Sequence, residues 1–423
     1  MKKVNVLLIL MVILLGALSL YKLSNKYNLN ILKSNIDCTI VVKGCEKARA
    51  LSADDDKNIY IAFSDYIKSV DREGKEKLIY KEKSIDIEDM VYYDNSLIYI
   101  SEDGVYRISL SDSGKETLCS NVPLSGNDLK RRLIIDGDTL YIAIGARTNS
   151  GISEGDYADI PPVEVTLNGN NYGAKLTGAF KKYGVKSENG EKIPAGSIGN
   201  AAIYTFNLKN KKLSLYSTGI RGVKGMTLNS KGEIEAIFSG MNNEGLRAVN
   251  RDKDYIYKIE KGQCYGWPDF SGGDPIDSPR FKGDEIIKPL LKTSKDRNVS
   301  GPIYQSEELN SIQGIAADKY GKVLDKDTVM FWNSKSEKIC TLSVQKVYKE
   351  ILKLKSSSNI ENIICTSDEF LLLDNEAGCV YSVHKKNDVL GFKVPVVIIF
   401  FIFILSVSLL IIILYKLISR NKK

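Results

Sequence analysis

The sequence predicts an all-β domain, a six-bladed β-propeller, carried between hydrophobic segments at the two ends of the chain. Three observations lead to this prediction. A two-strand unit recurs along the middle of the chain, no amphipathic helical period of useful length interrupts it, and a long apolar run lies near each terminus.

The recurring unit is a polar turn with Asp, Asn or Gly, a β-rich strand, a second turn and another strand. Because each strand alternates or is rich in Ile, Tyr, Val and Leu, we expect the units to be antiparallel hairpins. Six such units predict a six-bladed propeller. A β-sandwich is the alternative, but it does not require turns at the same offsets in every unit. The six copies are residues 54–74, 93–114, 135–145 with 202–212, 229–240 with 255–262, 327–344 and 366–383.

Two long insertions separate the predicted strands, at residues 146–200 in the third blade and at 263–308 between the fourth and fifth blades. Long irregular loops on a rigid scaffold often carry function, so both are candidates for the rim of a shared pocket. The propeller is expected to occupy residues 38–386. Closure of the ring brings its first and last strands together.

The N-terminal segment predicts a signal peptide or a signal anchor over residues 1–22. Lys2 and Lys3 precede an apolar run at residues 6–20 that contains no charged residue. The small residues Ala17 and Ser19 form only a weak cleavage site, which favours an uncleaved anchor.

The C-terminal segment predicts a transmembrane helix over residues 394–415, which would span about 30 Å of hydrocarbon. A buried core helix is the alternative, but a helix that is apolar on every side is rarely found in a domain of this size. Basic residues fill the tail at 416–423, so both tails are expected in the cytoplasm and the propeller outside it, at the cell membrane.

Charge and cysteine content exclude other classes of protein. The net charge is +7, yet the lysines are scattered among acidic residues, which argues against a nucleic-acid partner. Seven cysteines without C-x-x-C spacing argue against a zinc module and a dense disulfide framework. Cys38 and Cys45 flank a short apolar run and are candidates for one disulfide, with each other or with other partners.

The third and fourth predicted blades carry a family resemblance. Residues 172–276 contain TGAFKKYGVKSENGEKIPAG, then STGIRGVKGMTLNSKGEIEAIFSG and YGWP. This stretch resembles the glucose/sorbosone dehydrogenase family, six-bladed propellers related to soluble quinoprotein glucose dehydrogenase. The tract at 156–169 resembles an insertion in one branch of that family. The chain is identified as a divergent member.

The resemblance implies pyrroloquinoline quinone (PQQ) over the propeller axis, a nearby calcium ion, a His that acts as general base and an Arg-Asn pair. His suits the base because its pKa is near neutrality. The one histidine here, His384, lies in the last predicted strand and does not align with that base. Asp128 lies at about the right place and is a weak candidate, because a carboxylate would need a pKa raised by burial.

The other family positions are kept in part. Arg221 aligns with the Arg of the pair, whereas Gly222 replaces its Asn. Gly240 and Met241 align with the backbone of the calcium site, where carbonyl ligands do not depend on the side chain. Because the expected His and Asn are missing, the residues kept do not support PQQ and calcium binding.

Several polar or aromatic residues have both a structural and a functional interpretation. Trp267, in the YGWP turn, would pack between blades or would stack on a sugar ring. Lys224 and Arg247 suit a solvated surface or inter-blade pairing as well as anion recognition. Asp252 and Asp254 suit a strand-capping turn or a structural cation site.

Three functions follow from these residues. The first is a membrane-anchored extracytoplasmic propeller that binds a saccharide or another polar ligand and lacks the quinoprotein base. The second is an active PQQ-dependent sugar dehydrogenase with an unusual base. The third is a structural or partner-binding propeller whose ligand pocket is filled by side chains. Hydrolase motifs such as G-x-S-x-G and H-E-x-x-H are absent from the sequence.

Overall fold

The computed structural model describes residues 29–83, 85–126, 129–283, 285–292 and 299–386. They form β-strands and one 3₁₀ helix, η1 (Pro279–Phe281). Within these ranges, no helix combines the length and apolar character that a membrane span requires. The predicted segments at 1–22 and 394–415 and the tail at 416–423 lie outside the described residues.

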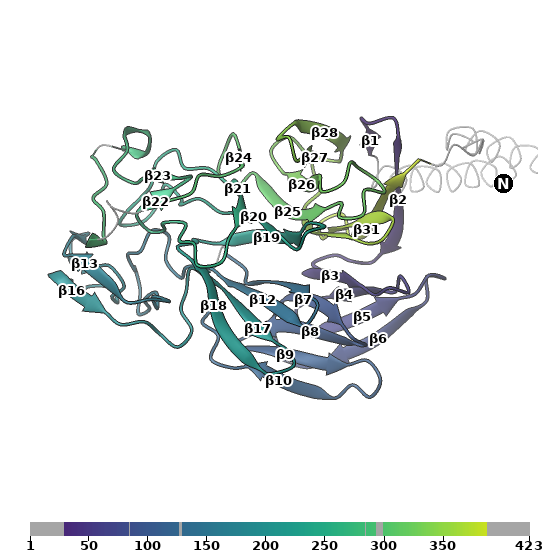
Figure 1. Cartoon of the computed structure of the whole chain (residues 1–423), viewed down its shortest axis with the longest axis horizontal. Coiled ribbons are helices and arrows are strands. Elements are labelled where there is room, and N and C mark those ends of the chain that lie inside the picture. The colour runs from purple at the N-terminus through teal and green to yellow at the C-terminus, as the bar shows by residue number, and fades with distance from the viewer. Residues whose placement is uncertain (1–28, 84, 127–128, 284, 293–298, 387–423) are drawn as a thin grey trace, which may run out of the picture. The chain divides into compact units, whose positions relative to one another are not determined.

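Among the described residues, six antiparallel sheets of four or five strands confirm the predicted six-bladed β-propeller (Figure 1). Blade 1 contains β3 (Ala50–Ala53), β4 (Ile59–Ala62), β5 (Tyr66–Val70) and β6 (Glu76–Lys81). Blade 2 contains β7 (Ile87–Tyr93), β8 (Ser96–Ser101), β9 (Gly104–Ser109) and β10 (Lys115–Cys119). Blade 3 contains β11 (Arg132–Asp136), β12 (Thr139–Ile144), β17 (Ala202–Asn207) and β18 (Lys212–Thr218).

The second half of the ring repeats this arrangement. Blade 4 contains β19 (Val223–Leu228), β20 (Ile234–Phe238), β21 (Tyr255–Ile259) and β24 (Tyr304–Gln305). Blade 5 contains β25 (Ile312–Ala317), β26 (Val329–Asn333), β27 (Lys338–Leu342) and β28 (Tyr348–Lys353), with β1 (Asn30–Ile31) beside β28. Blade 6 contains β29 (Ile360–Cys365), β30 (Glu369–Asp374), β31 (Cys379–Lys385) and the N-terminal β2 (Ile36–Lys43).

The first strand of each blade lies next to the propeller axis. Each of these inner strands contacts the inner strand of the next blade, in the order β3, β7, β11, β19, β25, β29 and back to β3. Blades 3 and 6 are therefore on opposite sides of the axis, three positions apart around the ring.

Strand β2 closes the ring, as the sequence predicts. It pairs with β31 in an antiparallel register that places Cys38 opposite Val383 and Val42 opposite Val380. The first long strand of the chain thus supplies the outer edge of the last blade, and Figure 1 shows β2 and β31 side by side.

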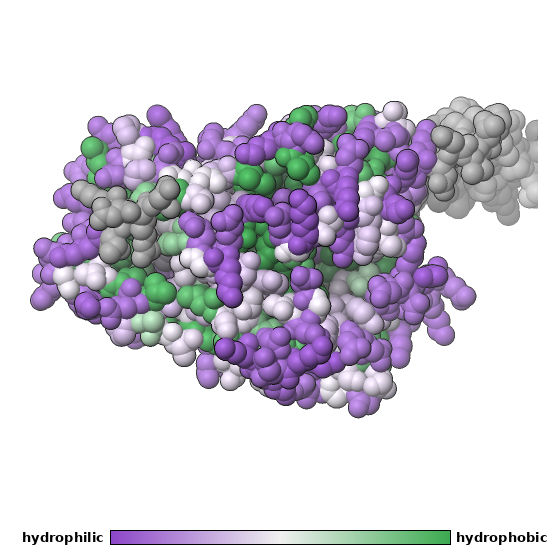
Figure 2. All heavy atoms as spheres, in the orientation of Figure 1, coloured by the Kyte–Doolittle hydropathy of each residue, from purple (hydrophilic) through white to green (hydrophobic). Residues whose placement is uncertain are grey.

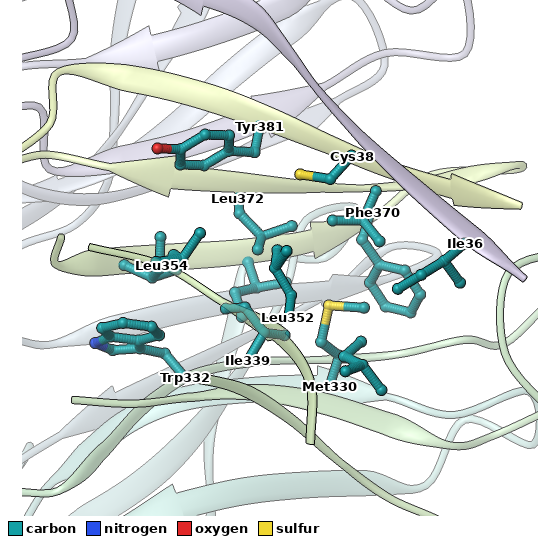
Figure 3. Close-up of a cluster of buried hydrophobic side chains, with 14 of the residues drawn as sticks. Ile36, Cys38, Met330, Trp332, Ile339, Leu352, Leu354, Phe370, Leu372 and Tyr381 are labelled. Atoms are coloured by element: carbon teal, nitrogen blue, oxygen red, sulfur yellow. The ribbon is translucent and has the colours of Figure 1, made fainter. Parts of the chain in front are cut away.

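A hydrophobic cluster joins blades 5 and 6 at this closure (Figure 3). Met330 and Trp332 of β26 face Phe370 and Leu372 of β30, and all four side chains are fully buried. Full burial of one such side chain contributes roughly 1.5–3 kcal/mol. This cluster, to which β2 adds Ile36 and Cys38, therefore holds the closing strand to two blades.

The hairpin turns explain why the repeated unit is visible in the sequence. Asp94 and Asn95 link β7 to β8 as a two-residue turn between the paired residues Tyr93 and Ser96. Both have positive φ, 42° and 51°, which is the conformation of a type I′ turn. Asn and Asp tolerate this region better than other side chains, so the turn residues mark the hairpin.

The two predicted insertions are excursions from the propeller. The first contains β13 (Val165–Asn168), β14 (Asn171–Tyr172), β15 (Thr177–Gly178) and β16 (Asn189–Ile193), and the second contains β22 (Phe270–Ser271), β23 (Asp274–Pro275) and η1. They lie together on the left of Figure 1, where a bridge pairs Leu167 with Leu291. The predicted place of the second excursion, between blades 4 and 5, is wrong. It lies within blade 4, because the two-residue strand β24 follows it and pairs with β21.

The candidate disulfide of Cys38 or Cys45 does not form. All seven cysteines are described, and none of them is in a disulfide bond. Cys38 packs between blades 5 and 6, whereas Cys45 packs in a different cluster with residues of blades 1 and 6, so their side chains do not meet. Burial raises the pKa of the Cys38 thiol and of the Cys45 thiol to about 12.

On the face of the molecule drawn in Figure 2, hydrophilic side chains surround small apolar patches.

Candidate functional site

The structure brings together three residues predicted from the family resemblance. The carbonyl of Asn149, in the first excursion, accepts hydrogen bonds from Arg221 Nε and from Trp267 Nε1, both at 3.2 Å. Arg221 lies between β18 and β19 and also donates from Nη1 to Ser239 Oγ at 2.7 Å. Met241 packs in the same hydrophobic cluster as Trp267. Loops of blades 3 and 4 and both excursions therefore meet at one place.

Trp267 is a packing residue in this arrangement. Its side chain is buried, and Phe180 contacts its ring edge to face, with 6.1 Å between the ring centroids. Little of the indole surface remains for a sugar ring to stack on. The geometry therefore favours the structural interpretation of the YGWP turn.

The backbone at Gly240 and Met241 is held by Asp252. The Asp252 carboxylate accepts hydrogen bonds from Met241 N at 2.6 Å, Tyr255 Oη at 2.7 Å and Ser271 Oγ at 2.8 Å. Burial raises the pKa of Asp252, and these donors oppose that effect. A Cβ atom at Gly240 would lie 2.1 Å from the Lys253 carbonyl, so this position requires glycine. Asp252 thus shapes the backbone rather than a cation site.

Little space remains between Arg221, Met241 and Trp267. The cavity bordered by Arg221, Met241 and Trp267 has a volume of about 20 Å³, because the aromatic rings of Phe238, Tyr255, Tyr257 and Tyr265 surround it. That volume is about the size that one water molecule needs. A planar organic cofactor does not fit there.

Asp128 lies outside the described residues, but its neighbour Leu129 is buried over Gly222. A Cβ atom at Gly222 would lie 2.4 Å from Leu129 Cδ2, and one at Gly145 would lie 3.2 Å from Leu129 Cδ1. Leu129 therefore fills the space that a side chain at position 222, such as the family's Asn, would need.

An ion pair crosses the propeller axis. Glu361 lies near the start of β29 in blade 6. Its carboxylate forms ion pairs with Arg132 Nη2 at 2.9 Å and with Lys130 Nζ at 2.7 Å. Both cations come from blade 3, on the opposite side of the ring. The Arg132 and Glu361 side chains are each 9% exposed. Burial alone would raise the pKa of Glu361, but Arg132 and Lys130 outweigh it and lower that pKa. Burial lowers the pKa of Lys130, so Arg132 is the permanent cation of this axial ion pair.

Asp89 of β7 completes this buried cluster. It accepts hydrogen bonds from Leu133 N at 2.8 Å and Met90 N at 3.0 Å. Burial raises its pKa to about 6 in spite of the attraction of Arg132. Opposite inner strands are thus joined by charges at one end of the axis.

A polar groove of about 410 Å³ lies between the first excursion and the loop that follows β20. Its walls are tied together, because Asn149 Nδ2 donates to the Asn242 carbonyl at 2.8 Å and Leu246 N donates to Glu154 Oε1 at 2.7 Å. The guanidinium of Arg147 lies over the ring of Tyr157, 5.2 Å from its centroid. The groove is lined by Arg147, Asn149, Glu154, Tyr157 and Glu244, among others, and it also borders Arg221.

A buried ion pair supports the floor of this groove. Arg247 Nη2 contacts Asp269 Oδ1 at 2.9 Å, and Arg247 Nη1 donates to the carbonyls of Ser150 and Pro268. Asp269 in turn accepts from Leu290 N and Leu291 N. Arg247 therefore joins the two excursions to the loop after β20, the structural role considered for it in the sequence.

Sequence reasoning did not single out the axial cluster or Tyr157. Arg132 and Glu361 each lie in a short, otherwise mostly apolar strand, RLIID in β11 and IENIIC in β29. A charged residue in such a strand is the sequence feature that could have indicated the axial ion pair. The described residues contain no group of three or more His, Cys, Asp or Glu side chains arranged to hold a metal ion. His384 is a strand residue of β31, as predicted.

No protein-family model and no curated protein matches the sequence. Several solved structures are similar to this chain in fold. The PQQ domain of pyranose dehydrogenase from Coprinopsis cinerea has a TM-score of 0.57 and 11% identity, over 85% of this chain and 97% of that one. The PQQ-bound aldose sugar dehydrogenase from Streptomyces coelicolor has a TM-score of 0.54 and 12% identity, over 85% and 98%.

A calcium structure of a carbohydrate-active enzyme of family AA12 from Trichoderma reesei has a TM-score of 0.60 and 10% identity, over 85% of this chain and 98% of that one. The predicted resemblance to sugar dehydrogenase propellers is thus confirmed for the fold. The residues present do not reproduce the family's quinone site, because the aligned His and Asn are missing and Leu129 fills the space over Gly222.

Proposed function

We propose that this chain is a saccharide-binding propeller, held outside the cytoplasm by membrane segments at both ends, that does not oxidise its ligand. The groove beside Tyr157 is the observation that carries the proposal. It combines a volume of about 410 Å³ with charged and amide side chains, which can hydrogen-bond hydroxyl groups, and with an aromatic ring, which can pack against a sugar ring. Membrane attachment rests on the apolar runs of the sequence and on the basic residues beside them.

The contacts assign roles within the groove. The Tyr157 ring offers an apolar face and a hydroxyl, while Arg147 holds that ring in place by a cation–π contact. Glu154 and Glu244 add acceptors for sugar hydroxyls, and Glu154 also fixes the loop wall through Leu246 N. A neutral saccharide suits the groove because both charge signs line it.

The test is isothermal titration calorimetry on the full chain in detergent, with maltose and cellobiose as probes. We expect saturable binding of at least one probe, reduced about tenfold or more in Tyr157→Ala. Tyr183→Ala is the matched control, because Lys175 lies over Tyr183 at 5.0 Å in the same excursion and neither residue lines the groove. Equal loss in both variants, or no binding of either sugar, would contradict the proposal and favour a structural or partner-binding propeller.

Dye-linked oxidation of glucose, with PQQ and calcium supplied, tests the alternative of an active dehydrogenase. We expect no turnover. Oxidation that disappears in Asp128→Asn and survives His384→Ala would overturn this expectation and identify Asp128 as the base.

A further inference from the structure

A second cavity, of about 500 Å³, follows the propeller axis and is separate from the groove. Residues of all six inner strands, β3, β7, β11, β19, β25 and β29, line it. The volume lies within the range of small-molecule sites. The saccharide proposal does not use this space.

Arg132 borders this cavity beside the axial ion pair. The residue is 7% exposed, and its Nε and Nη1 have no hydrogen-bond partner among the described residues, although Nη2 contacts Glu361. A buried polar group without a hydrogen-bond partner is energetically unfavourable. An Arg guanidinium keeps its charge and prefers carboxylate or phosphate oxygens as acceptors. This end of the cavity is therefore suited to an anionic group.

The wall of the cavity is suited to hydroxyl groups. Each inner strand is the terminal member of its sheet, so one edge presents backbone N–H and C=O groups to the axis. Some of these groups are already used, since Tyr92 N donates to Ser52 Oγ and Ala317 N donates to Thr227 Oγ1. The remainder can exchange hydrogen bonds with a polar ligand as they do with water.

The other end of the axis provides the entry. Exposed residues from the loops that follow inner strands border the cavity there, among them Asp55, Tyr320 and Ser367. The ion pair of Arg132 with Glu361 spans the axis at the opposite end. A ligand would therefore enter past Tyr320 and meet Arg132 last.

From these observations we infer that the axial cavity binds a small hydroxylated carboxylate, whose carboxylate meets Arg132 and whose hydroxyl groups meet the inner strand edges. This site is independent of the saccharide groove, because no groove residue named above lines the axial cavity. Glu361 and Asp89, which line the same end of the cavity, both compete with the ligand for Arg132.

The test is isothermal titration calorimetry on the full chain in detergent with D-gluconate. D-sorbitol, which has a similar carbon chain and hydroxyl groups but no carboxylate, is the matched neutral probe. We expect saturable gluconate binding and at least tenfold weaker sorbitol binding. Inorganic phosphate separates a general anion site from the proposed one. Absence of gluconate binding, or sorbitol or phosphate binding as tight as that of gluconate, would overturn the inference.

Two variants test the role of the axial ion pair. Arg132→Lys keeps a cation for Glu361 but removes the guanidinium donors, so gluconate binding should weaken about tenfold or more. Glu361→Gln removes one of the two competing charges and should tighten gluconate binding several-fold. Arg251→Met removes one exposed positive charge outside the cavity and should leave binding unchanged. Circular dichroism checks that each variant is folded. An Arg132→Lys variant that binds normally, or a folded Glu361→Gln variant that binds more weakly, would contradict the inference.

Discussion

At the scale of single residues, the charges on the axis are the least expected feature of this propeller. Arg132 and Glu361 are 229 residues apart in the chain, yet they meet because blades 3 and 6 face each other across the ring. Desolvation of two charges costs several kcal/mol, which only close pairing and further hydrogen bonds offset. The axial ion pair therefore links opposite blades only while both partners are present.

Glu361→Met should destabilise the protein by about 3–5 kcal/mol, because it takes the shared counter-charge from the buried Arg132 and the partly buried Lys130. The double variant Arg132→Met with Glu361→Met should cost less than the sum of the single variants, since it removes the unpaired charge as well. Urea denaturation of the three variants measures the coupling. Strictly additive costs would show that the pair is not coupled.

The buried carboxylate of Asp159 should make the unfolding free energy of the protein fall as the pH rises. It accepts a hydrogen bond from Arg147 N at 2.6 Å, and burial raises its pKa from 3.8 to about 6. The folded state then binds the proton more tightly than the unfolded state does. The resulting stabilisation is complete below about pH 4 and is lost as the pH rises through about 6.

Asp159→Asn should therefore flatten the fall in unfolding free energy between pH 4 and pH 6. Denaturation at a series of pH values measures it, with Asp156→Asn as an exposed control whose slope matches the wild type. An unchanged slope in Asp159→Asn would show that this carboxylate does not titrate as described.

At the scale of elements, the sequence predicts the middle strands of each blade and misses the others. The second and third strands are joined by tight turns and are rich in buried apolar residues, as in β8 (SLIYIS) and β9 (GVYRIS). The inner strands carry charged residues toward the axis, as β29 does with Glu361. The outer strands are exposed, and β6 (EKLIYK) therefore lacks an apolar pattern.

The candidate site is predictable to a similar extent. The resemblance places Arg221, Met241 and Trp267 in neighbouring sequence segments, and the structure brings them together around Asn149. It does not reveal that Leu129 fills the space over Gly222, because that contact depends on how the loop before β11 packs on the loop before β19.

Gly222→Asn, which restores the family's Arg-Asn pair, should destabilise the fold because its Cβ would lie 2.4 Å from Leu129 Cδ2. The expected cost is about 1–3 kcal/mol, typical of an overpacked core. Adding Leu129→Ala should recover part of that cost by opening the space, although Leu129→Ala alone should destabilise. Thermal denaturation of the three variants tests this coupling, and a stable Gly222→Asn variant would show that Leu129 does not block the position.

At the scale of the whole molecule, the ring depends on residues from both ends of the propeller. Strand β2 supplies the outer edge of blade 6 and places Ile36 and Cys38 in the cluster of Figure 3. Folding therefore requires contacts between residues more than 300 positions apart, such as Cys38 and Val383. Contacts between residues so far apart in the sequence slow folding. The last blade stays incomplete until β2 pairs with β31.

The proposed topology, with the propeller outside and both termini in the cytoplasm, rests on Lys2 and Lys3 before the first apolar run and on the basic tail at 416–423. A protease added to intact cells should cleave the propeller and spare an epitope tag placed after Lys423. Permeabilised cells are the control, because the protease should then remove the tag as well. Immunoblots for the propeller and the tag distinguish the two arrangements. A tag that is removed from intact cells while the propeller survives would reverse the orientation and place the groove in the cytoplasm.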